Sequence, residues 1–150
     1  MKEFHGTAGT TVLAPLERSF ATVYAVEDYP DWNRDLFRTV EVLERDADGG
    51  ASRARAKLRV ARGRFVKEFE LLVAVRAERP KAVYIERIPH EPSDEEGLQL
   101  IWGLKGDQER TQIELRFAAA ISSLPSFLPL GGAGDQIARS LVQGVTRALA

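Results

Sequence analysis

Residues 53–60 read RARAKLRV, and this stretch decides the fold class. Small or apolar residues alternate with basic residues along its whole length: Ala54, Ala56, Leu58 and Val60 against Arg53, Arg55, Lys57 and Arg59. Alternation with a period of two is typical of an antiparallel strand with one buried and one exposed face. The sequence therefore predicts a sheet that packs one face against a core.

The same alternation recurs on both sides of this stretch, between turn signals such as Asp48-Gly49-Gly50 and Pro80. Strands are predicted for residues 4–13, 40–46, 53–60, 65–75, 83–88, 97–105 and 111–121. The last six follow one another through turns and short loops, which is typical of an antiparallel meander. We expect the resulting seven-stranded sheet to twist and curl.

Three helices are predicted, two short and one long. Apolar residues recur at helical spacing from Leu16 to Val26, and Asp28 is placed to cap a second short helix that contains Trp32. Near the end of the chain, apolar residues recur every fourth position: Ile137, Leu141, Val145 and Leu149. Asp135 is expected to cap this last helix, because the glycines just before it disfavour an earlier start.

An apolar sheet face has to be covered, and the C-terminal helix is the only long amphipathic element that can cover it. We therefore expect an α+β fold in a single domain over residues 1–150: a curved seven-stranded antiparallel sheet around a long C-terminal helix, with two short helices after the first strand. A curved sheet and a straight helix do not interdigitate everywhere. The space between them predicts an internal cavity.

Several short motifs are spread over nearly the whole chain. They are VLAP at residues 12–15, VEDYPDW at 26–32, VEVL at 40–43, the late strand pair with Trp102 and Thr111, and Leu124-Pro125 before the last helix. With these motifs the chain resembles the START-like, polyketide cyclase/dehydrase superfamily, whose fold is called helix-grip, and it is most similar to the coenzyme Q-binding and polyketide cyclase subgroup. The resemblance implies a cavity for a lipid, a quinone or a polycyclic aromatic compound.

Nine side chains are predicted to line this cavity: Trp32, Leu58, Phe69, Leu71, Tyr84, Trp102, Leu115, Ile137 and Leu141. Trp32 is expected at the rim, where it could stack on a flat ligand, and the others are expected to point inward. Packing is the more frequent role of a large aromatic residue such as Trp32. For Trp102, packing and pocket lining fit the pattern equally well. Tyr84 adds a hydroxyl that could orient a carbonyl or phenol of a ligand.

The composition argues against several other kinds of site. The chain has no cysteine, so disulfides and thiolate chemistry are excluded. Its two histidines are not spaced with other ligands, and no metal or cofactor is expected. The glycines of residues 131–134 lack the Lys and Ser/Thr of a phosphate-binding loop, so we interpret them as a flexible joint. No catalytic residue is predicted.

The formal net charge of −1 gives no general attraction to nucleic acid or anionic lipid. The basic residues of 53–59 are expected to form a solvated face that pairs with Glu68 and Glu70, so no nucleic-acid partner is expected. No apolar stretch is long enough for a membrane span, and no apolar leader follows Met1. A cytoplasmic location is therefore expected, while the oligomeric state stays open.

Three functions remain as hypotheses. Binding or carrying a hydrophobic small molecule is favoured, because it needs only an enclosed apolar volume and a few polar anchors. A polyketide cyclase, aromatase or dehydratase would need a general acid or base in the cavity, for which Lys67 and Tyr84 are the best inward-facing residues. A translation regulator like the toxin branch of the superfamily is supported only by the basic strand face. The prediction therefore leans away from an enzyme.

Overall fold

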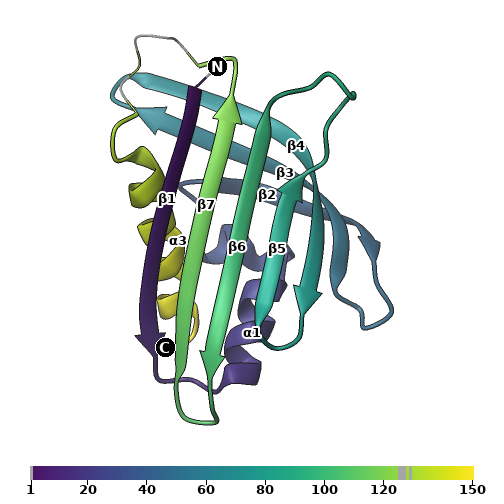
Figure 1. The fold of residues 1–150 in the computed structure, drawn as a ribbon, viewed down its shortest axis with the longest axis vertical. Coiled ribbons are helices and arrows are strands. Elements are labelled where there is room, and N and C mark those ends of the chain that lie inside the picture. The colour runs from purple at the N-terminus through teal and green to yellow at the C-terminus, as the bar shows by residue number, and fades with distance from the viewer. Residues whose placement is uncertain (1, 125–127, 129) are drawn as a thin grey trace.

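The computed structural model describes residues 2–124, 128 and 130–150. The elements, in chain order, are β1 (Lys2–Val12), α1 (Leu16–Tyr24), η1 (Val26–Asp28), α2 (Tyr29–Trp32), β2 (Phe37–Arg45), β3 (Ala51–Arg62), β4 (Phe65–Glu78), β5 (Ala82–Arg87), β6 (Gly97–Gly106), β7 (Thr111–Ile121) and α3 (Ala133–Ala148). Seven antiparallel strands and a long C-terminal helix confirm the predicted helix-grip architecture (Figure 1).

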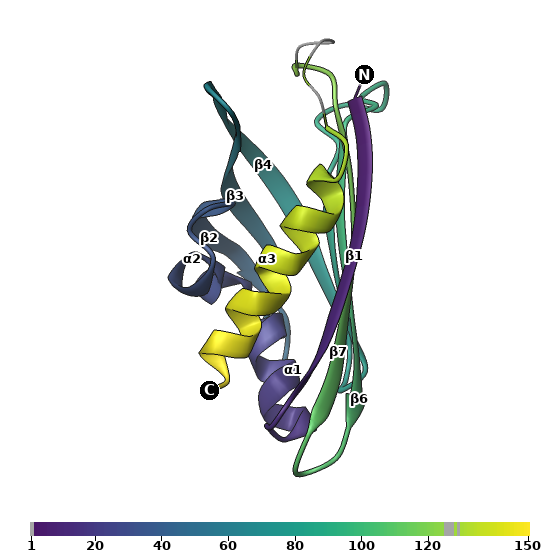
Figure 2. The ribbon, with the colours of Figure 1, turned by 90° about the vertical axis from the view of Figure 1, so that its left-hand side faces the viewer.

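The sheet has the order β1-β7-β6-β5-β4-β3-β2, so the strands from β2 to β7 form a meander and β1 closes it beside β7. The sheet curves around α3: in Figure 2, β2 and β3 lie on one side of the helix, β1, β7 and β6 lie on the other, and β4 crosses behind it. Register shifts interrupt the pairing of β2 with β3. Such irregularities bend a strand and increase its local twist.

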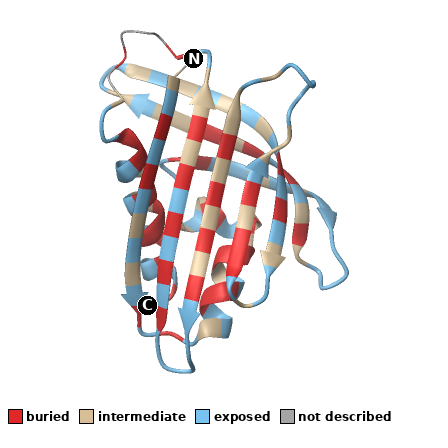
Figure 3. Ribbon diagram, viewed as in Figure 1, coloured by how far each residue is buried: buried red, intermediate tan, exposed pale blue. Residues whose placement is uncertain are grey.

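Alternating burial explains why these segments form half-buried strands. In β7, Ile113, Leu115 and Phe117 are buried, whereas Glu114 and Arg116 between them are exposed. The stripes of Figure 3 show the same alternation on the neighbouring strands. The predicted alternation of residues 53–60 is present in β3, where the small side chains face the core and the arginines point outward.

The helices α1 and α2 are short and consecutive, as predicted, and the single turn of η1 joins them. Asp28 precedes α2 at the predicted capping position, but its side chain makes no capping hydrogen bond. Among the residues that the structure describes, no helix is both long and apolar enough to span a membrane.

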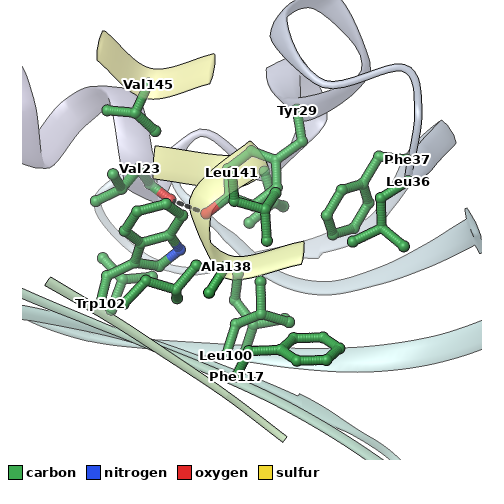
Figure 4. Packing of buried hydrophobic residues seen from close by; sticks show 14 of the residues in the cluster. Val23, Tyr29, Leu36, Phe37, Leu100, Trp102, Phe117, Ala138, Leu141 and Val145 are labelled. Atoms are coloured by element: carbon green, nitrogen blue, oxygen red, sulfur yellow. Dashed lines mark hydrogen bonds between the residues drawn. The ribbon is translucent and has the colours of Figure 1, made fainter. Parts of the chain in front are cut away.

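Buried side chains of α3 and the sheet meet in the core (Figure 4). The helix contributes a fully buried face that includes Ala138, Leu141 and Val145. Tyr29 lies beside this face and has no exposed surface. Its hydroxyl donates a hydrogen bond of 2.5 Å to the carbonyl oxygen of Val23, and its ring packs edge-on against the ring of Trp102. Burial raises the pKa of the Tyr29 phenol, so this hydroxyl acts as a donor that fixes the α1–α2 corner.

The start of α3 differs from the prediction. The helix begins at Ala133, and the preceding residue, Gly132, adopts a left-handed conformation with φ of 77°. Asp135 therefore lies inside the first turn and does not cap the helix. Its carboxylate instead accepts a hydrogen bond of 3.0 Å from the backbone N–H of Thr7 in β1. The helical turn predicted at residues 123–125 includes Pro125, which lies outside the described residues.

A close backbone contact explains why the helix tolerates an early glycine. A Cβ atom at Gly134 would overlap with the carbonyl group of His5, and one at Gly6 would overlap with the backbone of Gly134. Both residues are buried where α3 crosses β1. Gly134, one of the glycines that were expected to form a flexible joint, therefore allows the backbone of α3 to pack directly against the backbone of β1.

Replacement of Gly134 by alanine tests this contact. Alanine normally stabilises a helix relative to glycine by about 1 kcal/mol, but here we expect Gly134→Ala to lower the free energy of unfolding by about 2 kcal/mol through overpacking. Urea denaturation measures the change. Gly103→Ala is the matched control, because open space surrounds a Cβ atom there. An unchanged or raised stability of Gly134→Ala would contradict the contact.

Candidate functional site

A cavity lies between the first two turns of α3 and the ends of β1 and β3. Its outer part has a volume of about 420 Å³, which falls within the range of roughly 300–1,000 Å³ for small-molecule sites. Apolar side chains of Phe4, Leu36, Val60 and Ile137 line it together with polar ones. The polar residues are Asp35, Arg59, Arg62, Gln136 and Ser140.

The inner part of the cavity continues from the outer part toward β6 and β7. It shares the same four apolar residues and adds an apolar wall made of Leu58, Phe69, Leu71, Leu98, Phe117 and Ala119. Its volume is about 40 Å³, which is space for roughly three water-sized groups. A ligand would therefore occupy mainly the outer part and place a small apolar end against the inner wall.

The cavity exists because β3 extends beyond its neighbour β2. Pairing starts where Phe37 lies opposite Leu58, so the last residues of β3 have no β2 neighbour. The N–H group of Arg59 donates a hydrogen bond of 2.8 Å to the carbonyl oxygen of Leu36, the residue just before β2. In Figure 2, the β3–β4 hairpin leans away from α3 at this end.

Four of the nine predicted residues lie together on this cavity. Leu58, Phe69 and Leu71 line its inner part from β3 and β4, and Ile137 of α3 lines both parts. Ile137 is only partly buried, whereas the next residue on its helix face, Leu141, is fully buried. The helix thus passes from packed core to open cavity within one turn. Contact of these four residues with a ligand stays a prediction.

Four other predicted residues do not line the cavity: three pack in the interior, and the partly buried Trp32 packs against the core from α2. Trp102, Leu115 and Leu141 have no exposed surface, and Figure 4 shows Trp102 and Leu141 among the core side chains. Trp32 packs its ring against Tyr29 with centroids 4.6 Å apart and lies against α3. The sequence pattern placed these side chains on the inner face correctly. It could not show how far along the helix axis the cavity extends.

The prediction that Tyr84 faces the cavity is wrong. Its neighbours Val83 and Ile85 are the buried residues of β5, so Tyr84 points from the outer face of the sheet. There its ring lies 4.1 Å below the guanidinium of Arg76, and its hydroxyl is 3.4 Å from the Glu78 carboxylate. Because side chains alternate along a strand, an assignment shifted by one residue inverts the face.

Arg87 and Glu96 line the inner part of the cavity and were not predicted as site residues. Arg87 takes the next inward position of β5 after Val83 and Ile85, so correct alternation would have indicated it. Its guanidinium lies 2.7 Å from the Asp94 carboxylate and donates a hydrogen bond of 3.0 Å to the carbonyl oxygen of Glu96. Ionisable side chains therefore flank an otherwise apolar wall.

The Arg87 guanidinium also holds the pKa of Asp94 down to about 2, and backbone N–H groups of the same loop assist. Although Asp94 lies in the acidic run of residues 91–96, its side chain is only 13% exposed. The loop between β5 and β6 is therefore anchored at the cavity by an ion pair.

The basic face of β3 forms ion pairs, as expected, with Glu70 as one of the predicted partners and with two further glutamates of β2. Arg55 lies 3.1 Å from Glu41 and 3.3 Å from Glu70, and Arg53 lies 3.5 Å from Glu44. Carboxylates of β2 thus provide part of the pairing that was assigned to β4. In the described part of the chain, no three histidine or carboxylate side chains are grouped to hold a metal ion.

The model of the family described as polyketide cyclase / dehydrase and lipid transport matches residues 12–146. The chain belongs to this family. This confirms the resemblance to the START-like, polyketide cyclase/dehydrase superfamily, while the placement near the coenzyme Q-binding subgroup stays a prediction. No curated protein sequence matches the chain.

Solved structures show the same fold at low sequence identity. A START superfamily protein from Mycobacterium smegmatis is 15% identical and has a TM-score of 0.74, with 97% of this chain and 96% of that chain covered. A Thermus thermophilus protein is 17% identical, with a TM-score of 0.66 and 97% of both chains covered. The Zhui aromatase/cyclase from Streptomyces is 19% identical, with a TM-score of 0.57, 98% of this chain and 86% of that chain covered.

The ion pair between Arg87 and Asp94 predicts a pH dependence of stability. A carboxylate with a lowered pKa stabilises the folded state above its ordinary pKa of about 3.9, and this contribution is lost as the pH falls toward 2. We therefore expect Asp94→Asn to lower the urea midpoint at neutral pH and to differ little from the unmodified protein near pH 2. Glu95→Gln, in the same loop, is the control. An equal loss at both pH values would contradict the assignment.

Proposed function

We propose that the protein binds a hydrophobic small molecule in this cavity and carries it without changing it chemically. The observation that supports the proposal most is the shared lining of the two parts of the cavity: Phe4, Leu36, Val60 and Ile137 border both the outer part of about 420 Å³ and the inner part, whose wall is built almost entirely of apolar side chains. Burial of apolar ligand surface against such a wall contributes about 25 cal/mol per Å².

The distribution of polar groups indicates an amphipathic ligand. An apolar body would lie between Val60 of β3 and Ile137 of α3, with its end against Phe69 and Leu71. Polar substituents would face the outer part, where Gln136 and Asp35 offer hydrogen-bonding groups. Lipids, quinones and polycyclic aromatic compounds with polar substituents all have this character. The lipid transport in the family description agrees with it.

The first test uses the purified protein. Native mass spectrometry beside denaturing mass spectrometry detects a bound molecule by the mass difference, and we expect a co-purifying hydrophobic compound. If the protein is empty, a panel of fatty acids, quinones and aromatic polyketides should contain members that raise its melting temperature by mass action. A protein that is empty and unaffected by every member of the panel would contradict the proposal.

A blocked cavity tests the location of the ligand. Ile137→Trp places a larger side chain into both parts of the cavity, and we expect it to lower the affinity for the fluorescent probe 1-anilinonaphthalene-8-sulfonate by at least about tenfold, or about 1.4 kcal/mol. Ile101→Trp adds the same bulk on the outer face of β6 and should bind the probe normally. Equal effects of the two substitutions would show that the probe binds elsewhere.

One observation favours an enzyme as a second candidate. Glu96 is the only carboxylate on the inner part of the cavity among the described residues, and a cyclase or dehydratase needs a general acid or base there. Its oxygen Oε2 accepts a weak hydrogen bond of 3.3 Å from the backbone N–H of Ser122. The neighbour Zhui carries the name aromatase/cyclase.

Glu96→Gln separates the two functions, because the amide keeps the shape of the side chain but cannot transfer a proton. For a carrier we expect unchanged affinity for the bound compound and no conversion of any panel member, which product analysis by mass spectrometry checks. Conversion by the unmodified protein that falls at least about a hundredfold in Glu96→Gln would establish the enzyme instead.

A further inference from the structure

Residues 59–67, which form the end of the β3–β4 hairpin, carry an unusual charge. They read RVARGRFVK and contain four basic and no acidic residues. Because the whole chain has a net charge of −1, the remaining residues together carry −5. We refer to residues 59–67 as the basic hairpin. We propose that the basic hairpin docks the protein on an anionic lipid surface.

The basic hairpin borders the cavity. Val60 and Ala61 line the outer part together with the arginines at 59 and 62. In Figure 2 the hairpin projects at the same end of the molecule as the start of α3. Arg62 donates hydrogen bonds to the side chain of Gln136, at 2.9 Å, and to the carbonyl oxygen of Gly131, at 3.5 Å. A surface that meets the hairpin therefore also meets the opening of the cavity.

Three of the four basic residues of the basic hairpin lie outside ion-pair distance of the carboxylates that the structure describes, although Glu68 stands opposite Arg59 in the pairing of β3 with β4. Within the described part of the chain, no carboxylate lies at ion-pair distance from Arg59, Arg64 or Lys67. Further along the same strand, Arg53 and Arg55 are paired with glutamates. Positive charge without an ion-pair partner is thus concentrated around the β3–β4 turn, where an anionic surface would attract it. Each basic residue near such a surface contributes about a fivefold gain in binding.

An exposed apolar side chain distinguishes a lipid surface from a nucleic acid. Val66 is 51% exposed on the outer face of β4, two residues after the exposed Arg64, and an exposed apolar residue next to a basic one suits insertion at the boundary between headgroups and acyl chains. Lys67 points from the opposite face, where its ammonium lies 5.5 Å from the centre of the Phe69 ring. Binding of single-stranded nucleic acid uses exposed aromatic rings for base stacking. The only aromatic residue of the hairpin, Phe65, is half-buried against the core. The observations therefore favour a lipid surface over RNA.

Docking through the basic hairpin would turn the cavity opening toward the bilayer, so that a hydrophobic molecule could move between membrane and cavity without crossing bulk water. The docking itself needs only the charge and the exposed valine. It is therefore independent of the ligand that fills the cavity, and it goes beyond the proposed binding function.

Vesicle flotation tests the docking with the complete chain. We expect the protein to float with phosphatidylcholine vesicles that contain phosphatidylglycerol, not to float with phosphatidylcholine alone, and to dissociate at high salt, because the Debye length falls to about 3 Å at 1 M. Arg64→Glu with Lys67→Glu should weaken binding at least about tenfold. The matched control is Lys105→Glu with Arg110→Glu, which makes the same charge change near the β6–β7 turn at the opposite end (Figure 1).

A second variant keeps the test decisive if the charge reversals unfold the protein. Val66→Ser leaves the charge unchanged at an exposed position, and we expect several-fold weaker vesicle binding with an unchanged melting temperature. Absence of binding to anionic vesicles, equal losses in the hairpin and control variants, or binding of RNA in place of vesicles would each overturn the proposal.

Ligand affinity measured without vesicles separates this proposal from the function of the cavity. Arg64 does not line the cavity, so Arg64→Glu should bind 1-anilinonaphthalene-8-sulfonate in solution as the unmodified protein does. Loss of docking with normal probe binding supports the docking role of the hairpin. If the unmodified protein binds anionic vesicles but does not bind the probe, the proposed cavity function is contradicted. The docking proposal is then still supported.

Discussion

The close approach of α3 to β1 is the constraint on which the rest of the structure depends. Gly134 and Gly6 bring two backbones together where any side chain would separate them, and Asp135 ties the same helix turn to Thr7. This contact anchors the start of the helix on one edge of the sheet. The β3–β4 hairpin leans away from the helix at this end (Figure 2). Because the backbone at the start of α3 packs directly against β1 but not against this hairpin, a cavity remains between the helix and the hairpin.

The molecule is therefore divided along the axis of α3. In one half, the helix face from Ala138 onward packs against the sheet and the Tyr29 corner without exposed surface. In the other half, Ile137 borders open space, and the Arg87–Asp94 pair holds the loop that closes the inner end. Packing thus supplies stability in one half, while the other half keeps a volume that a ligand can fill. A protein interior otherwise leaves few voids larger than a water molecule.

Much of the fold was predictable from the sequence, because strand alternation and helical periodicity are local properties. The alternation of β3 and β4 and the apolar face of α3 indicated the architecture and four of the cavity residues, Leu58 among them. Periodicity indicates a face but not a depth, which is why the fully buried Trp102 was assigned to the cavity. Tyr84 was placed on the wrong face by a shift of one residue. The start of α3 depends on Gly6, which lies far away in the sequence.

The central claim is that the space beside the start of α3 receives a hydrophobic molecule and that the packed half does not. Methyl-resolved NMR during titration with 1-anilinonaphthalene-8-sulfonate tests it most directly, because assigned methyl groups report contact residue by residue. The account predicts shifts for Leu58, Leu71 and Ile137 and none for Leu115 and Leu141. Shifts confined to the last two, or to Ile101 on the outer face, would contradict it.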